Sequence, residues 1–195
     1  MKEKSAKIIR IISIPPVMVS VMFIFLILFR YDIFNSPVDI VIDIAMLGVL
    51  PVLAYPISKL IPQLAEKGRD GQRKLAFILS VVGYTFAFAY AIIFRSSKDN
   101  LLIVMTYFIS VIVLSVLNAL FHIKASGHAC SSAGPLIMVS YFAGNWIIIP
   151  SLIIMGLIIW SSFYLKRHTA LQLAAGVASA YFSFFLSLGI IYLLF

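Results

Sequence analysis

Two histidines with cations beside them are the residues of this chain best suited to acid–base chemistry. The segment 124–128 (KASGH) interrupts a very apolar region, and the segment 167–169 (RHT) opens the last apolar stretch. An imidazole can act as a general acid or base near neutral pH. Because membrane-spanning chains place ionisable groups sparingly, the clusters around His128 and His168 are hypotheses for a functional site.

The residues that precede His128 suit the binding of an anion. Gly127 lets the backbone approach a ligand closely, while Ser126 offers a hydroxyl group and Lys124 a positive charge. The segment leads into a predicted helix N-terminus, where free N–H groups favour an anion. The alternative interpretation is an ordinary loop, because Ser-Gly-His is a common loop sequence.

Two arginines lie four residues apart in the polar segment 66–74, just before an apolar run. Arg69 and Arg73 can be read as positive anchors that fix the topology of the next helix. They can also be read as a clamp, because a guanidinium group presents a rigid fork of donors that matches phosphate oxygens.

The segment 161–176 combines cations, a histidine and a glutamine. Arg167 and His168 precede the last predicted helix, and Gln172 follows one helical turn later. Its amide oxygen can therefore accept a hydrogen bond from an N–H of the imidazole. Gly176 and the small residues after it allow close helix packing. The alternative is a cationic cluster that caps a helix at the membrane interface.

The composition indicates an integral membrane protein. The 195 residues are 63% hydrophobic and 11% charged, far from the soluble balance of about 25% charged residues. The polar breaks are short, so residues 1–195 are predicted to form a single transmembrane domain. The net charge of +8 resides at segment ends, without a basic tail or an RNA-binding motif, which argues against nucleic acid and favours lipid phosphates. Cys130 is the single cysteine, so no intrachain disulfide can form.

The apolar runs predict an all-α, polytopic helical bundle of about six to seven membrane helices. A spanning helix needs about 20 apolar residues. The first run continues to residue 29, longer than the core of a signal peptide, so it is expected to remain as a span with a kink at Pro15-Pro16. The predicted crossings are 8–29, 38–61, 75–94, 101–121, 131–146, 147–164 and 169–194.

Seven crossings place the N-terminus and the loops 62–74, 122–130 and 165–168 on one face of the membrane. The 15 Lys and Arg residues then divide 12 to 3 in favour of that face. Without the six candidate site cations the division is 6 to 3. Positive residues mark the cytoplasmic side, so the motif loops are predicted to face the cytoplasm, in a protein of the plasma (cytoplasmic) membrane.

The acidic residues suggest no metal centre at the histidines. Glu66 and Asp70 make no cluster suited to Mg²⁺ on the shared face, so a metal-free site without a cofactor is predicted. Asp39 and Asp43 lie four residues apart on one face of the second predicted span. They mark either a polar helix start near the interface or an ion or proton site.

Segments 126–129 (SGHA) and 164–176 (YLKRHTALQLAAG) resemble the second and third signature motifs of the type 2 phosphatidic acid phosphatase superfamily, which are membrane lipid phosphate phosphatases. The resemblance covers about residues 62–180. It implies that His168 is the nucleophile that forms a phosphohistidine and that His128 is the acid that protonates the leaving alcohol. It further implies phosphate-binding roles for Ser126, Gly127 and one of the arginines at 69 and 73.

Three positions depart from the family pattern. Ala125 stands where the family has proline, Ser162 where it has arginine and Gln172 where it has aspartate. A neutral glutamine orients an imidazole but stabilises an imidazolium less than a carboxylate does. Lys124 and Arg167 offer further cations for the phosphate.

These observations predict a metal-independent lipid phosphate phosphatase that acts on a polyprenyl or glycerolipid phosphate or diphosphate. Two alternatives stay open at this stage. One is a catalytically impaired membrane protein that binds lipid phosphates. The other is a small lipid transporter whose cationic loops serve as topology anchors.

Overall fold

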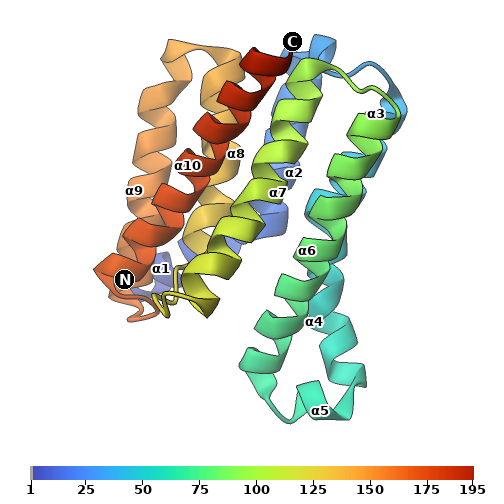
Figure 1. Cartoon of the computed structure of the whole chain (residues 1–195). Coiled ribbons are helices and arrows are strands. Elements are labelled where there is room, and N and C mark those ends of the chain that lie inside the picture. Colours follow the sequence, from blue (N-terminus) through green and yellow to red (C-terminus); the bar gives the residue numbers. More distant parts are fainter. Residues whose placement is uncertain (1) are drawn as a thin grey trace.

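The computed structural model describes residues 2–195, which form helices joined by short loops and contain no strand (Figure 1). The helices are α1 (Lys2–Ile12), α2 (Pro15–Phe29), η1 (Tyr31–Ile33), α3 (Pro37–Asp43), η2 (Ile44–Val49, a π-helix), α4 (Leu50–Leu60), α5 (Pro62–Ala65), α6 (Gly68–Ile93), α7 (Lys98–Ala119), α8 (Gly127–Ala143), η3 (Asn145–Ile147), α9 (Ile148–Tyr164) and α10 (Ala170–Leu194).

The helix lengths support a membrane-embedded bundle with fewer full-length spans than the seven predicted. Five helical stretches are long and apolar enough to cross a membrane, namely Pro37–Leu60, α6, α7, Asn145–Tyr164 and α10. The bent pair α1 and α2 would be a sixth. The predicted crossing 131–146 corresponds to α8, whose 17 residues fall short of that length. The count of five, or six with the bent pair, reaches the lower bound of the predicted six to seven, but the seven crossings are not reached by length.

The predicted kink at Pro15-Pro16 is present. The axes of α1 and α2 meet at 61°. Both prolines stand in the first turn of α2, where their missing N–H groups cost no helical hydrogen bond. The chain therefore turns sharply between Ile12 and Pro15, and α1 packs against α9, where Ser161 Oγ donates to the Ala6 carbonyl at 2.8 Å.

The polar loops predicted to share one face of the membrane lie at one end of the bundle, which is the lower end in Figure 1. This end holds α1, α5, the 120–126 loop and the 165–169 loop. The opposite end holds the connections 30–36, 94–97 and 144–147 together with the C-terminus. The tight turn after α8 has Gly144 at φ 88°, a conformation that favours glycine.

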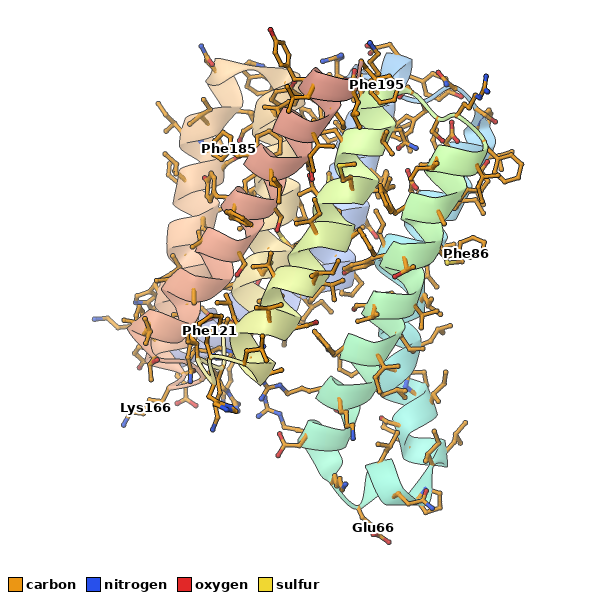
Figure 2. All side chains as sticks on the ribbon, in the orientation of Figure 1. Glu66, Phe86, Phe121, Lys166, Phe185 and Phe195 are labelled. Carbon is orange, nitrogen blue, oxygen red and sulfur yellow. The ribbon has the colours of Figure 1, made fainter. Side chains whose placement is uncertain are left out.

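The sides of the bundle carry large apolar side chains that point outward. Phe86 and Phe185 are 51% and 62% exposed, and Figure 2 shows both directed away from the helices. Figure 2 also shows Lys166 and Glu66 at the lower end, where charged groups gather. This distribution suits a protein whose sides face hydrocarbon and whose ends face water.

Candidate functional site

A cavity of about 840 Å³ opens at the end of the bundle that carries the polar loops. Its walls come from α1, α2, α4, α6, α7, α8 and α10 and from the loop before α10. Its buried lining is largely apolar and aromatic, with Tyr84, Tyr107 and Leu114 among its residues. At the mouth the lining carries the cations and both candidate histidines, namely Arg10, Arg69, Arg73, Lys74, Arg167, His128 and His168.

A close contact between the 120–126 loop and α10 brings the two histidines to one cavity. The N–H of Ser126 donates to the carbonyl oxygen of Gln172 at 2.8 Å. Gly176 packs so tightly on this loop that a Cβ there would lie 2.3 Å from the Ser126 carbonyl oxygen. The predicted close packing at Gly176 is therefore confirmed, and its partner is the segment that carries His128.

The predicted contact between His168 and Gln172 is also present. His168 Nδ1 and Gln172 Oε1 are 3.3 Å apart. The Thr169 N–H donates to the same Oε1 at 3.3 Å, which identifies that atom as an acceptor. Nδ1 of His168 must therefore carry the proton and donate it to Oε1. The other ring nitrogen, Nε2, keeps a free lone pair in the neutral imidazole.

The charge state of His168 follows from its surroundings. Burial lowers its pKa, the hydrogen bond to Gln172 raises it, and the positive charges of Arg10 and Arg73 lower it further. The net pKa lies below the usual 6.5. At neutral pH His168 is therefore mainly neutral, which is the form in which an imidazole is a nucleophile.

His128 contacts the junction between α1 and α2. Its Nε2 lies 3.2 Å from Ser13 Oγ, and the Ser13 hydroxyl lies 3.4 Å from the carbonyl of Arg10. Ser132, one turn further along α8, donates to the Ser13 carbonyl at 3.2 Å. Burial, together with the charges of Arg10 and His168, lowers the pKa of His128 from 6.5 to about 4.

Arg10 is the residue of the cavity mouth that sequence reasoning missed. It is one of the 12 Lys and Arg residues predicted on the shared face, and the bend after α1 places it in the cavity wall. Its Nη1 donates to Ser162 Oγ at 3.5 Å, although the two residues are 152 positions apart. The sequence signal that could have revealed it is its position just ahead of the Pro15-Pro16 kink.

The remaining predicted phosphate ligands divide into two groups. Arg69, Arg73, Arg167 and Gly127 line the cavity as expected. Lys124 and Ser126 do not contribute to its lining.

Local structure explains why those two residues lie elsewhere. Lys124 is exposed in the loop, with its backbone in the left-handed region at φ 55°. Ser126 is fully buried, and its Oγ accepts the N–H of Ala129 at 3.2 Å as the N-cap of α8. The structure therefore assigns Ser126 to capping α8.

The comparisons with known proteins were made for the whole chain. No family model, curated protein or solved structure matches it. Within residues 2–195 there is also no group of three or more His, Cys, Asp or Glu side chains placed to hold a metal ion.

Proposed function

We propose that the protein is a membrane-embedded lipid phosphate phosphatase and a divergent member of the type 2 phosphatidic acid phosphatase superfamily. The observation that carries this proposal is one cavity with two imidazoles and a cluster of cations at its mouth and apolar walls behind them. Such a cavity suits an amphiphile whose phosphate lies at the mouth and whose tail extends between the helices.

The proposed first step transfers the phosphoryl group to His168. Nε2 attacks phosphorus, the bond between phosphorus and the lipid oxygen breaks, and that oxygen takes a proton from the His128 imidazolium. Nδ1–H of His168 stays hydrogen-bonded to Gln172, which keeps the lone pair of Nε2 aimed away from α10. The cations at the mouth stabilise the charge on the phosphoryl oxygens.

In the second step water releases the phosphate. His128, now neutral, takes a proton from the water as its oxygen attacks phosphorus and the bond between phosphorus and Nε2 breaks. The products are inorganic phosphate, free His168 and the protonated His128 that began the cycle. Each group thus returns to its starting state without a metal ion.

The low pKa of His128 links its protonation to substrate binding. In the free protein its pKa of about 4 leaves it neutral at pH 7. A bound phosphate monoester brings negative charge beside the ring, and nearby negative charge raises the pKa of an imidazole. The acid of the first step would therefore be formed when the substrate binds.

The proposed substrate is a polyprenyl or glycerolipid phosphate or diphosphate, hydrolysed at the cytoplasmic face of the plasma membrane. Apolar side chains of α4, α6 and α7 form the inner walls, including Val52, Phe77 and Val111. These side chains present a surface for a hydrocarbon chain. The excess of Lys and Arg at this end of the bundle supports the assignment of the face.

The test is a screen of phosphatidic acid, phosphatidylglycerol phosphate, and isoprenoid mono- and diphosphates with the purified protein. We expect phosphate release from at least one of them and its loss in His168→Ala. Thermal unfolding of both proteins controls for misfolding. Release from none of these lipids, or an unchanged rate in His168→Ala, would overturn the proposal.

A second candidate function is lipid phosphate binding without turnover. It is favoured by Gln172, whose neutral amide supports the charge on His168 less than a carboxylate would. It predicts tight binding of a lipid phosphate with no phosphohistidine at position 168. The transporter alternative is weakened because both imidazoles line the same cavity.

A further inference from the structure

We propose that Arg10 of the N-terminal helix α1 is a phosphate-binding residue of this cavity and that α1 completes the site. The ligand class is a phosphoryl oxyanion, such as the head of a lipid phosphate monoester. The inference deepens the proposed function, and its catalytic consequence rests on that function, but anion binding by Arg10 can be tested without any turnover.

Arg10 lacks a carboxylate partner within residues 2–195. It is only partly exposed, and no carboxylate oxygen among residues 2–195 lies within 4.0 Å of its guanidinium. Its one side-chain hydrogen bond is the 3.5 Å contact from Nη1 to Ser162 Oγ. Because a guanidinium group carries five N–H donors, most of its hydrogen-bonding capacity is open to a ligand.

Arg10 lies in a cavity whose lining carries several other positive charges. It is close enough to Arg167, Arg69 and Arg73 for their positive charges to act on it. Its own charge in turn lowers the pKa of both His128 and His168. Like charges that converge on one cavity repel each other unless an anion lies between them. These three arginines and both histidines line the same cavity as Arg10, so an anion that Arg10 binds would lie in the cavity that holds the proposed reacting groups.

Hydrogen bonds to α9 and α8 fix the position of α1. Ser161 donates to the carbonyl of Ala6, a residue with no exposed surface. Just beyond the other end of the helix, the Ser132 hydroxyl donates to the carbonyl oxygen of Ser13. The Ser13 Oγ atom lies 3.2 Å from His128 Nε2. The two contacts fix α1 against α9 and α8. The fixed position of α1 therefore places Arg10 in the lining of the cavity.

The experiment compares Arg10→Gln with Lys7→Gln, a matched change of charge on the same helix. Lys7 is exposed and pairs with Glu3, away from the cavity lining. Each protein is unfolded thermally in detergent with inorganic phosphate and with potassium chloride of equal ionic strength. The shift in midpoint between the two salts measures anion binding.

We expect phosphate to raise the midpoint of the wild type and of Lys7→Gln by about 3–6 °C at about ten times the dissociation constant. In Arg10→Gln the shift should be lost. A full shift in Arg10→Gln, or none in the wild type, would overturn the inference. The midpoints in potassium chloride report separately whether Arg10→Gln folds.

The pH dependence of kcat/KM is a further measurement. It would not change if Arg10 had only a structural role. Removal of the Arg10 charge raises the pKa of His168, so the acid limb of kcat/KM should move to higher pH in Arg10→Gln. The limb should stay in place in Lys7→Gln. A lower rate in Arg10→Gln with an unmoved limb would contradict the role at the reacting groups.

The two proposals fail in different ways. If His168→Ala is inactive while Arg10→Gln keeps both the phosphate shift and full activity, the phosphatase stands and Arg10 is an anchor. If phosphate stabilises the wild type through Arg10 but no lipid phosphate is hydrolysed, the binding residue stands and the phosphatase fails.

Discussion

Arg30 and Arg10 lie at opposite ends of the bundle, and of these two arginines only Arg30 has a carboxylate partner within residues 2–195. At the C-terminal end, Arg30 forms hydrogen bonds to Asp32, with Nη2 and Oδ2 2.9 Å apart, and to the carbonyl of Phe142 at 2.8 Å. At the histidine end, Arg10 makes one 3.5 Å contact to a hydroxyl group. The difference indicates that Arg30 holds the fold together, whereas Arg10 is available for a ligand.

Two acidic residues of α3, Asp39 and Asp43, also differ in whether they have hydrogen-bond partners. Asp39 accepts hydrogen bonds from Ser36 N–H and Ser96 Oγ and completes a capping box at the start of α3. This confirms the polar helix start for Asp39. Asp43, one turn on, is fully buried and has no hydrogen-bond partner within the described chain. The capping box at the start of α3 therefore accounts for Asp39 but not for Asp43.

The largest effect expected from a change at the histidine end, beyond the loss of His168, comes from His128→Ala. Removal of the acid should lower kcat by about 10²–10⁴-fold on a lipid phosphate. The loss should be much smaller on a phosphate ester whose leaving group needs no proton, such as an aryl phosphate. Equal losses on both substrates would contradict the role of His128 as the acid.

The contact between the 120–126 loop and α10 can be broken at Gly176. An alanine Cβ would meet the Ser126 carbonyl at 2.3 Å, so backbone must move. Gly176→Ala should destabilise the protein by about 1–3 kcal/mol and lower kcat by up to about 10²-fold, because it separates the two histidines. Gly189→Ala, at a position with open space around it, is the matched control on the same helix and should change neither stability nor rate appreciably.

Gln172→Glu tests how the charge beside Nδ1 of His168 changes the pKa of this histidine at the cavity end. A carboxylate beside Nδ1 stabilises the imidazolium and so raises the pKa of His168. A larger fraction of His168 is then protonated at any pH near that pKa. The acid limb of kcat/KM should therefore move to higher pH, and a shift toward lower pH would show that Gln172 does not face the ring during turnover.

The smallest effect is expected at the opposite end. Arg30→Gln removes a cation that is not part of the cavity lining. It should lower thermal stability, because the carboxylate of Asp32 and the carbonyl of Phe142 lose their donor, while kcat/KM stays within about twofold. A large loss of activity with unchanged stability would show that the two ends do not have the separate roles described above.

Local patterns in the sequence were enough to predict much of the fold and part of the site. Apolar runs located the helices and Pro15-Pro16 located the bend, because each of these features depends on neighbouring residues. The hydrogen bond from His168 to Gln172 follows from a spacing of four on one helix. The packing of Gly176 was also predictable in kind, since small residues allow close helix contacts.

Contacts between distant segments were not predictable in the same way. Arg10 and Ser13 reach Ser162 and His128 because of the 61° bend between two helices, an angle that no local pattern specifies. Ser126 had two possible uses, as phosphate ligand or helix cap, and the start of α8 at Gly127 decided for the cap. Its side chain is consequently buried beneath the cavity wall.

The central claim is that His168 accepts a phosphoryl group, and the most direct measurement is detection of that adduct. The wild-type protein is mixed with a lipid phosphate that it hydrolyses, quenched at alkaline pH, digested and analysed by mass spectrometry. We predict a phosphorylated peptide with the modification on His168, absent in His168→Ala. Phosphate release without such an adduct, or an adduct on another residue, would contradict the account.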